Sequence, residues 1–303
     1  MDVQIGGGAG RHHDHHSTRR TVDEVKEKRV PMIRAGRWCF ETSVELVRVA
    51  AETILDGVAI SEELVSGPDP AAWDTLTARL LPGLPLRETL VAGAKLGLVC
   101  TDHDDARWTE VIARRHVTDT QCVVAVTDPR TTRPGGRRPS ELVAAYAECD
   151  SIPAQAAGVW LEHGAVVGVR CGAEDVAVCW TVPKLQARVQ LETCVVPRAE
   201  RPDLVGAVAA MQDVTDLADH GIAITVLEAG EHRAAGLMGE TLRYRMMAPD
   251  GDVYQAIWCF GGTPDSISEP WARVELTAPA ILTEQAEQVW AELLAGLRRD
   301  VRA

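Results

Sequence analysis

Apolar and polar residues alternate over much of this chain, and alternation of this kind predicts β-strands. After residue 150 the runs GVWLEHG, AVVGVRCG, EDVAVCWTV and ARVQLETCVV follow one another with Gly or Pro between them, which predicts an antiparallel meander. The later runs IAITVLEAG, TLRYRMMA, DVYQAIWCF and WARVELT predict further strands, and PDGD (249–252) predicts a hairpin turn between two of them.

The first half of the chain is less regular. RWCFETSVELVRV (37–49) predicts strand structure with Trp38 and Phe40 on one face, and QCVVAVT (121–127) predicts a buried strand. RWTEVIARR (107–115) fits either a helix or a strand, and 128–139 is predicted to be a loop because it is rich in Pro, Gly and Arg.

Helices are predicted where apolar residues recur at three- and four-residue spacing. In DPAAWDTLTARLLPG, Asp69 is an N-cap candidate, Pro70 suits the first turn, and Pro82-Gly83 ends the helix. Ser140 predicts the cap of a short helix over ELVAAYAE, and Asp203 predicts the cap of a helix in the segment after it.

The last helix has the clearest signal. Thr283 is its predicted cap, and its apolar stripe predicts packing on the sheet. The stripe consists of Ala286, Val289, Trp290, Leu293, Leu294 and Leu297.

These patterns predict an α+β protein of two lobes, each a mostly antiparallel sheet with helices packed on it. A length of 303 residues favours two domains, and the change of character near residue 150 places the boundary. We therefore expect a disordered tail over 1–30, an N-terminal lobe over 31–150 and a C-terminal domain over 151–303. The tail is expected to be mobile because it is rich in Gly, His and charge and has no apolar periodicity.

Charge limits the partners. The chain has 31 Lys and Arg against 44 Asp and Glu, a net charge of -13, which disfavours nucleic acid and anionic membranes and leaves a basic protein surface as a suitable partner. No stretch reaches the ~20 apolar residues of a membrane-spanning helix, so no integral membrane contact is expected. The N-terminus lacks the apolar region of a signal peptide, which predicts a cytoplasmic protein, or a periplasmic one if the start is misassigned.

Eight cysteines are scattered without a CxxC pair, and several lie within apolar runs. This arrangement predicts buried thiols in a reducing compartment.

Candidate chemistry is sparse. His12, His13, His15 and His16 are dense enough to bind a metal, but they lie in the predicted tail, where no scaffold fixes a ligand geometry, so we expect no functional metal site. GGGAG (6–10) lacks the strand, helix and Lys of a phosphate loop, and no cofactor is expected.

Catalytic signatures are also missing from the sequence. It contains no G-x-S-x-G elbow and no H-E-x-x-H helix. The acidic patch 102–105 could hold a cation or supply a base, although a solvated loop or helix cap explains it more simply. The isolated histidines are most simply surface or core residues; they are His116, His163, His220 and His232. We expect no catalytic residue and no enzymatic activity.

Several short segments after residue 150 share their order and spacing with a known family. They are IPAQAAGVWLEHG (152–164), VPKLQARVQLETCV (182–195), HRAAGLMGETLRYR (232–245), YQAIWCFGG (254–262), EPWARVELT (269–277) and VWAELLAGLRRDV (289–301). Together they resemble the C-terminal domain of the immunity proteins that neutralise lipase effectors of type VI secretion. Val159-Trp160, Met238 and Thr241 depart from the family pattern. The matching residues are Gly158, Gly164, Gly236, Gly239, Glu240, Trp258, Pro270 and Trp290.

The resemblance implies a protein that is monomeric when free and whose two lobes grip a phospholipase effector, blocking its active-site entrance or the motion of its lid. Such inhibition by occlusion needs no acid, base or metal in the inhibitor. The sequence does not identify the partner-binding residues. Two alternatives stay open: a structural component or chaperone of a secretion machine, or an enzyme with an unrecognised site.

Overall fold

One broad antiparallel sheet dominates the chain. The structure, a computed structural model, describes residues 32–64, 86–102, 107–127, 137–148, 158–168, 171–198 and 220–299, with isolated positions between 203 and 210. Within these residues it contains a 12-stranded sheet, two three-stranded sheets and two α-helices. No helix among the described residues is long and apolar enough to cross a membrane.

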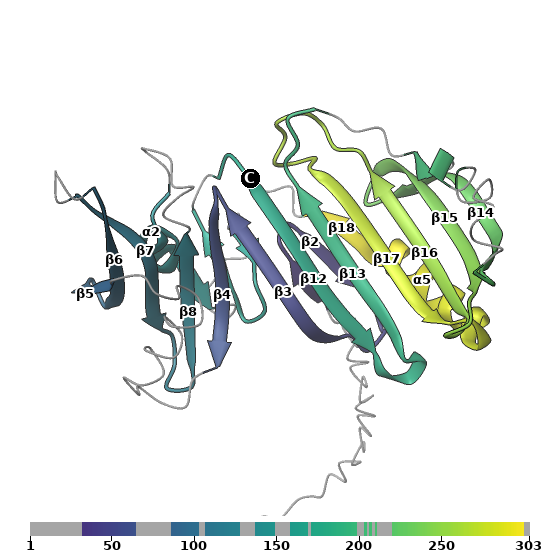
Figure 1. The fold of residues 1–303 in the computed structure, drawn as a ribbon, viewed down its shortest axis with the longest axis horizontal. Helices are drawn as coiled ribbons and strands as arrows, with labels where there is room; N and C mark the ends of the chain where they lie inside the picture. Colours follow the sequence, from purple (N-terminus) through teal and green to yellow (C-terminus); the bar gives the residue numbers. More distant parts are fainter. Residues whose placement is uncertain are drawn as a thin grey trace, which may run out of the picture.

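The large sheet extends from one end of the molecule to the other, and between β3 and β4 it is joined by only two register pairs (Figure 1). Its two edges are formed by strands from the two halves of the chain. Its strands are, in spatial order, β14 (Ala223–Ala234), β15 (Leu237–Met247), β16 (Val253–Phe260), β17 (Trp271–Pro279), β13 (Ala187–Cys194), β12 (Glu174–Val182), β3 (Val47–Leu55), β4 (Val58–Leu64), β8 (Gln121–Thr127), β7 (Arg107–His116), β6 (Ala94–Asp102) and β5 (Leu86–Val91).

The smaller elements pack against the large sheet. Helix α5 (Thr283–Gly296) contacts β16 and β17, and helix α2 (Pro139–Ala145) contacts β7 and β8. Two short 3₁₀ turns occupy Pro183–Leu185 and Ala280–Leu282. One small sheet contains β1 (Met32–Ala35), β2 (Trp38–Glu41) and β18 (Leu297–Arg299), and the other contains β10 (Gly158–Trp160), β11 (Gly164–Val167) and β9 (Tyr146–Glu148).

The main core lies between the large sheet and α5, because the strand residues alternate between a buried and a partly exposed face. On β17 the residues Ala272, Val274, Leu276 and Ala278 are buried, while the residues between them are half-buried. Trp38 packs edge-on against Trp258 with ring centroids 6.4 Å apart. Burial of these aromatic and aliphatic side chains removes apolar area from water and so stabilises this half of the molecule.

The structure corrects the expectation that each half of the chain has its own sheet. Strand β3 pairs with β12 along eight register positions, although they lie on opposite sides of residue 150, and β2 pairs with β18. Alternation identifies a strand but not its neighbour, because every strand edge presents the same backbone donors and acceptors. The protein is therefore mostly β, and the boundary near residue 150, which falls outside the described residues, stays a prediction.

Most of the strands after residue 150 are confirmed, as is the 121–127 strand, and 107–115 is the strand β7. The PDGD turn joins β15 to β16 as predicted. The short helix after residue 138 ends at Ala145, so the prediction of helix up to residue 148 is wrong: Tyr146–Glu148 forms β9. The helix predicted from Asp69 lies outside the described residues, as does the tail over 1–30. The helix predicted from Asp203 lies mainly outside them, but its cap is confirmed, because the backbone N–H of Gly206 donates to Asp203 Oδ1 at 2.7 Å.

Both predicted hydroxyl caps are wrong. The N-cap of α5 is Leu282, and Thr283 is the first helical residue, whose hydroxyl donates to the Ala280 carbonyl at 2.6 Å. The N-cap of α2 is Arg138, and the Ser140 hydroxyl donates to Glu110 at 2.8 Å. In each case the hydroxyl bonds a neighbouring element instead of the first turn of its own helix.

The six cysteines whose side chains the structure describes are thiols, as predicted. Cys194 is partly exposed, and the five buried ones are Cys39, Cys122, Cys171, Cys179 and Cys259.

Candidate partner-binding face

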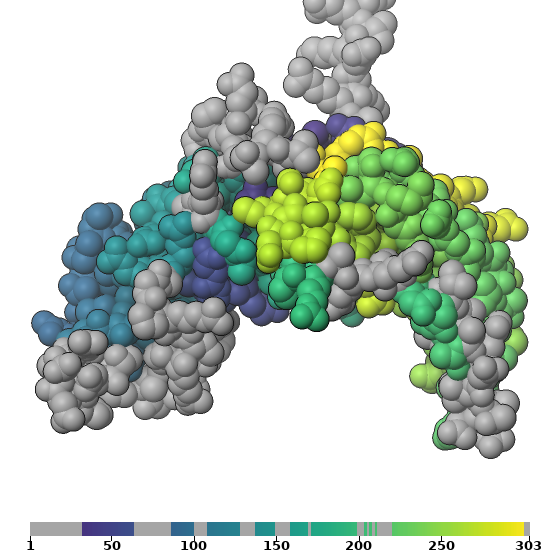
Figure 2. Space-filling model, turned by 90° about the horizontal axis from the view of Figure 1, so that it is seen from above, coloured from purple at the N-terminus to yellow at the C-terminus, as the bar shows by residue number. Residues whose placement is uncertain are grey.

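The large sheet is arched, and both described helices and the two small sheets pack on its convex side. Figure 2 shows one arm made by the strands of residues 86–127 and the other by the strands of residues 223–260, with a hollow between them. On the concave side the described residues bury parts of both arms, at Ile112 and Val124 and at Leu242 and Ile257. Both helices and β2 lie behind the sheet in Figure 1 and therefore on the convex side. We call the concave surface of β3, β12, β13 and β17, on which no other described element packs, the floor of the hollow.

Acidic residues gather in the middle of the floor. The register places Glu52 of β3 opposite Ala177 of β12, and Ala177 opposite Glu192 of β13. Asp175 lies two residues before Ala177 on β12, so its side chain is on the same face. Burial raises the pKa of Asp175, and the nearby charges of Glu52 and Glu192 raise it further. The floor therefore carries concentrated negative charge, which favours a partner with basic side chains.

A hydrogen-bonded network beside these acids extends the floor from β17 onto β16 and β15. Glu275 of β17 accepts from Gln255 and Arg273, and from the Thr277 hydroxyl at 3.4 Å. The Tyr244 hydroxyl donates to Gln255, and burial, followed by the charge of Glu275, raises the pKa of Tyr244. Because these side chains hold each other in place, this part of the floor is a rigid polar surface, which lowers the entropic cost of binding.

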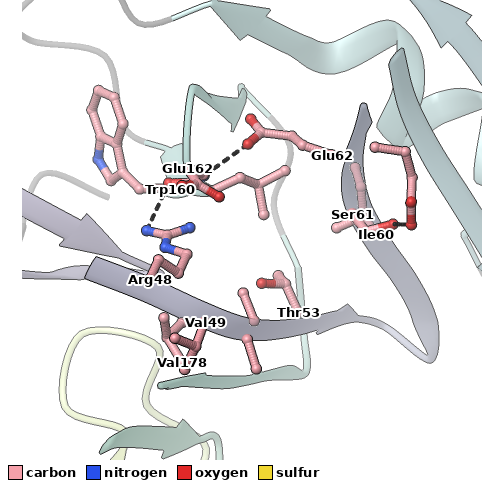
Figure 3. A pocket seen from close by; sticks show the side chains of 13 residues that line it. Arg48, Val49, Thr53, Ile60, Ser61, Glu62, Trp160, Glu162 and Val178 are labelled. Atoms are coloured by element: carbon pink, nitrogen blue, oxygen red, sulfur yellow. Dashed lines mark hydrogen bonds between the residues drawn. The ribbon is translucent and has the colours of Figure 1, made fainter. Parts of the chain in front are cut away.

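A pocket of about 260 Å³ opens between β3 and β4 at the centre of the arch (Figure 3). These strands share only the register pairs Ile54–Ala59 and Leu55–Val58 and then diverge. The Arg48 guanidinium lies at one end and donates to the carbonyls of Arg34 at 2.8 Å and Leu161 at 3.5 Å. The pocket is lined by Arg48, Val49, Ala50, Ala51, Thr53, Ile60, Ser61, Glu62, Glu63, Trp160, Leu161, Glu162 and Val178.

Glu62, Glu162 and His163 form the one described group with metal-ligand spacing, their ligand atoms lying within 4.8 Å of one another. The Glu62 carboxylate already accepts the Tyr146 hydroxyl at 2.6 Å and the backbone N–H groups of Glu162 and His163 at 2.9 Å and 2.8 Å. These donors use the lone pairs that a cation would need. The arrangement anchors the β10–β11 turn to β4 and does not fit a metal site.

The glycines that carry the family resemblance lie at turns and close contacts. A Cβ on Gly164 would lie 2.4 Å from the Ala147 carbonyl oxygen, and one on Gly239 would lie 2.4 Å from that of Cys259. A Cβ on Gly158 would lie 3.0 Å from the Val166 carbonyl oxygen. Gly236 has φ of 78° in the β14–β15 turn, where glycine avoids strain.

The remaining matching residues are also structural. Trp258 is fully buried and donates to the His232 carbonyl at 3.1 Å, and Trp290 is a core residue of α5. Pro270 is buried just before β17. Glu240 accepts the backbone N–H of Leu204 at 2.8 Å. The resemblance thus marks packing and turns, whereas the floor and the pocket were not identified from sequence.

The candidate chemical residues do not come together. His163, His220 and His232 are exposed, and His116 lies beside Arg114, with burial and then the charge of Arg114 lowering its pKa. The acidic patch over 102–105 lies outside the described side chains, as do the tail histidines and GGGAG. The only feature that could have signalled the floor was the exposed half of each alternating strand, which most sheet proteins also possess.

No protein-family model matches the chain, and no curated protein matches it significantly. Its fold is nevertheless shared with the type VI secretion immunity protein TplEi from Pseudomonas aeruginosa. In the complex of TplEi with the "L" peptide the TM-score is 0.66 at 18% identity, covering 89% of this chain and 98% of that chain. Apo TplEi gives a TM-score of 0.64 at 18% identity, covering 90% and 97%.

A chain of the Tle4–Tli4 complex has the same fold, with a TM-score of 0.63 at 16% identity, covering 90% of this chain and 98% of that chain. The resemblance inferred from residues 152–301 is therefore confirmed as a similarity of fold. The likeness also extends beyond that region, because about nine tenths of the chain is covered.

Proposed function

We propose that this chain is an immunity protein that binds a lipase effector of type VI secretion in the hollow of the arch and occludes its active-site entrance. The observation that carries the proposal is the fold match to TplEi over 89% of the chain, which spans both arms. Because the match includes both arms, the hollow between them has a counterpart in the fold of TplEi. TplEi has been solved with a peptide and Tli4 with Tle4, so proteins of this fold bind other polypeptides.

The described surface suits such a role. A concave floor of polar side chains can cover a convex partner surface, and occlusion requires only shape and complementary charge. The acidic residues Glu52, Asp175 and Glu192 supply negative potential where a partner would enter, which accelerates encounter with a basic surface. We propose that this interaction takes place in the cytoplasm, and fractionation of the producing cell tests that compartment.

The test is inhibition by the intact chain. Candidate type VI lipase effectors from the producing genome are assayed for ester hydrolysis with increasing amounts of purified chain, and we expect stoichiometric loss of activity for one of them. Glu52→Lys should lower the association rate several-fold and reduce its dependence on salt. The matched control is Glu284→Lys, an equal charge change at an exposed position of α5 on the convex side.

Each alternative reading predicts a different result. Binding to components of the secretion machine without inhibition would favour the structural component or chaperone. Turnover of an ester by the chain alone, lost on changing one residue of the 102–105 patch, would favour an enzyme. Equal effects of Glu52→Lys and Glu284→Lys on association would place the interface away from the floor.

A further inference from the structure

The hairpin of β3 and β4 opens much earlier than its length requires. β3 has nine residues and β4 has seven, yet only two register pairs join them, next to the Asp56–Gly57 turn. On their other sides β3 remains paired with β12 as far as Val47, and β4 with β8 as far as Leu64. The sheet is therefore continuous on both sides of a wedge-shaped gap, which is visible between β3 and β4 in Figure 1.

The inner edges of this gap present backbone hydrogen-bonding groups. In a hairpin with a two-residue turn, the pair beside the turn exchanges both hydrogen bonds, and every second residue beyond it faces the partner strand. Counting from Leu55 and Val58, the backbone groups of Ala51 and Thr53 on β3 and of Ile60 and Glu62 on β4 point into the gap. No register pair joins these four residues across it in the described part of the chain.

The gap is also hollow. The 260 Å³ pocket is bounded by consecutive residues of both strands, 48–51 and 60–63, so it lies between their facing edges. Its side chains on β3 and β4 include the small Ala50, Ala51 and Ser61, and Trp160, Leu161 and Glu162 line it from the β10–β11 hairpin. Edges of this kind attract a further strand, because an extended chain satisfies their N–H and C=O groups.

We propose that an extended segment of the partner protein inserts between β3 and β4 as an additional strand and completes the sheet. The identity of the partner rests on the proposed function. Glu63 and Glu162 line the pocket with carboxylates, while Arg48 donates to two backbone carbonyls, so the segment is expected to carry a Lys or Arg beside small residues. β3 is paired with β12 on the side of one arm, and β4 is paired with β8 on the side of the other. A strand inserted between β3 and β4 would therefore contact the sheet on both sides.

Hydrogen exchange of the full chain tests the insertion. The probe is the lipase effector that the chain inhibits in the assay above, with its nucleophilic serine replaced by alanine. On complex formation, amides in 49–53 and 60–63 should exchange at least about tenfold more slowly, and those of β7 should not change. A complex that forms without slower exchange in these two segments overturns the insertion and leaves the proposed function intact. Absence of any complex overturns both.

A backbone substitution provides the second measurement. Ala51→Pro removes an N–H that points into the gap, and because that N–H takes no part in the ladder to β12, the sheet should survive. We expect at least about tenfold weaker binding of the same lipase, whereas Ala51→Gly, which keeps the N–H and adds no side-chain volume, should weaken binding far less. Equal binding by both variants overturns the insertion. Should Ala51→Pro fail to fold, the exchange measurement on the unmodified chain decides. Slower exchange in 49–53 caused by a second copy of this chain, in the absence of the lipase, would also refute a partner strand.

Discussion

Gly239→Ala is expected to destabilise the protein strongly although it adds one methyl group. Gly239 lies on β15, and its added Cβ would lie 2.4 Å from the Cys259 carbonyl oxygen and 2.8 Å from Trp258 Nε1. An ordinary contact to the Cβ needs about 1 Å more room than this, and the Cys259 carbonyl is held within the paired strands β15, β16 and β17. The indole cannot yield easily either, because Trp258 is fully buried and hydrogen-bonded to the His232 carbonyl.

Overpacking a well-ordered core costs about 1–3 kcal/mol, and the backbone contact places this site at the upper end, about 2–3 kcal/mol. For a chain of this length that corresponds to a loss of roughly 3–5 °C in Tm. Thermal unfolding followed by circular dichroism measures the shift. Gly172→Ala is the control, because its Cβ would meet only Asp56 at 3.5 Å, and it should change the unfolding free energy by less than about 0.5 kcal/mol.

Two results would refute the reasoning. If Gly239→Ala melts within about 2 °C of the unmodified protein, the carbonyl contact is not rigid. If adding Trp258→Phe restores the Tm of Gly239→Ala, the indole rather than the backbone limits the space. We expect no rescue, because the shortest contact is to the carbonyl oxygen.

The other predictions concern the core and its charged contacts. Trp290→Ala removes a side chain that is 3% exposed, and should lower the unfolding free energy in urea by about 3–5 kcal/mol; a loss below about 0.5 kcal/mol would place Trp290 outside the core. Hydrogen bonds from Ser43 and Thr42 lower the pKa of Glu292 from its ordinary 4.5, so its contribution is complete above pH 4.5 and is lost as the pH falls through the lowered value. Glu292→Gln should therefore lower the free energy of unfolding by about 1–2 kcal/mol at pH 7 and by progressively less below pH 4.5. A difference between the two proteins that stays constant with pH would contradict this. Arg37→Met removes the partner that lies 2.8 Å from buried Glu174 and should lower the free energy of unfolding by about 3–5 kcal/mol. The double variant Arg37→Met, Glu174→Leu should recover most of this loss. A double variant as unstable as the single one would show that the ion pair itself stabilises the protein, and not that the unpaired charge destabilises it.

Local patterns were sufficient wherever a segment's own side chains decide its conformation. The alternation in 187–194 and 271–279 and the apolar stripe of 283–296 correctly predicted β13, β17 and α5, because a strand or helix must bury its apolar face whatever its neighbours are. The ambiguity at 107–115 was resolved only by tertiary structure, since β7 is paired on both sides by β6 and β8.

The sequence by itself therefore determined most of the strands, the last helix and the acidic character of the protein. It also determined the glycines and tryptophans that carry the family resemblance. Only the tertiary structure decided which strands are neighbours, because β3 and β12 meet through backbone groups that every residue carries. The same holds for the candidate site. Glu52, Asp175 and Glu192 lie on three different strands, and the β3–β4 gap exists because each strand is held more firmly by its outer neighbour than by the other. Charge density and an unfilled edge are properties of the assembled sheet, and no segment of the chain contains them alone.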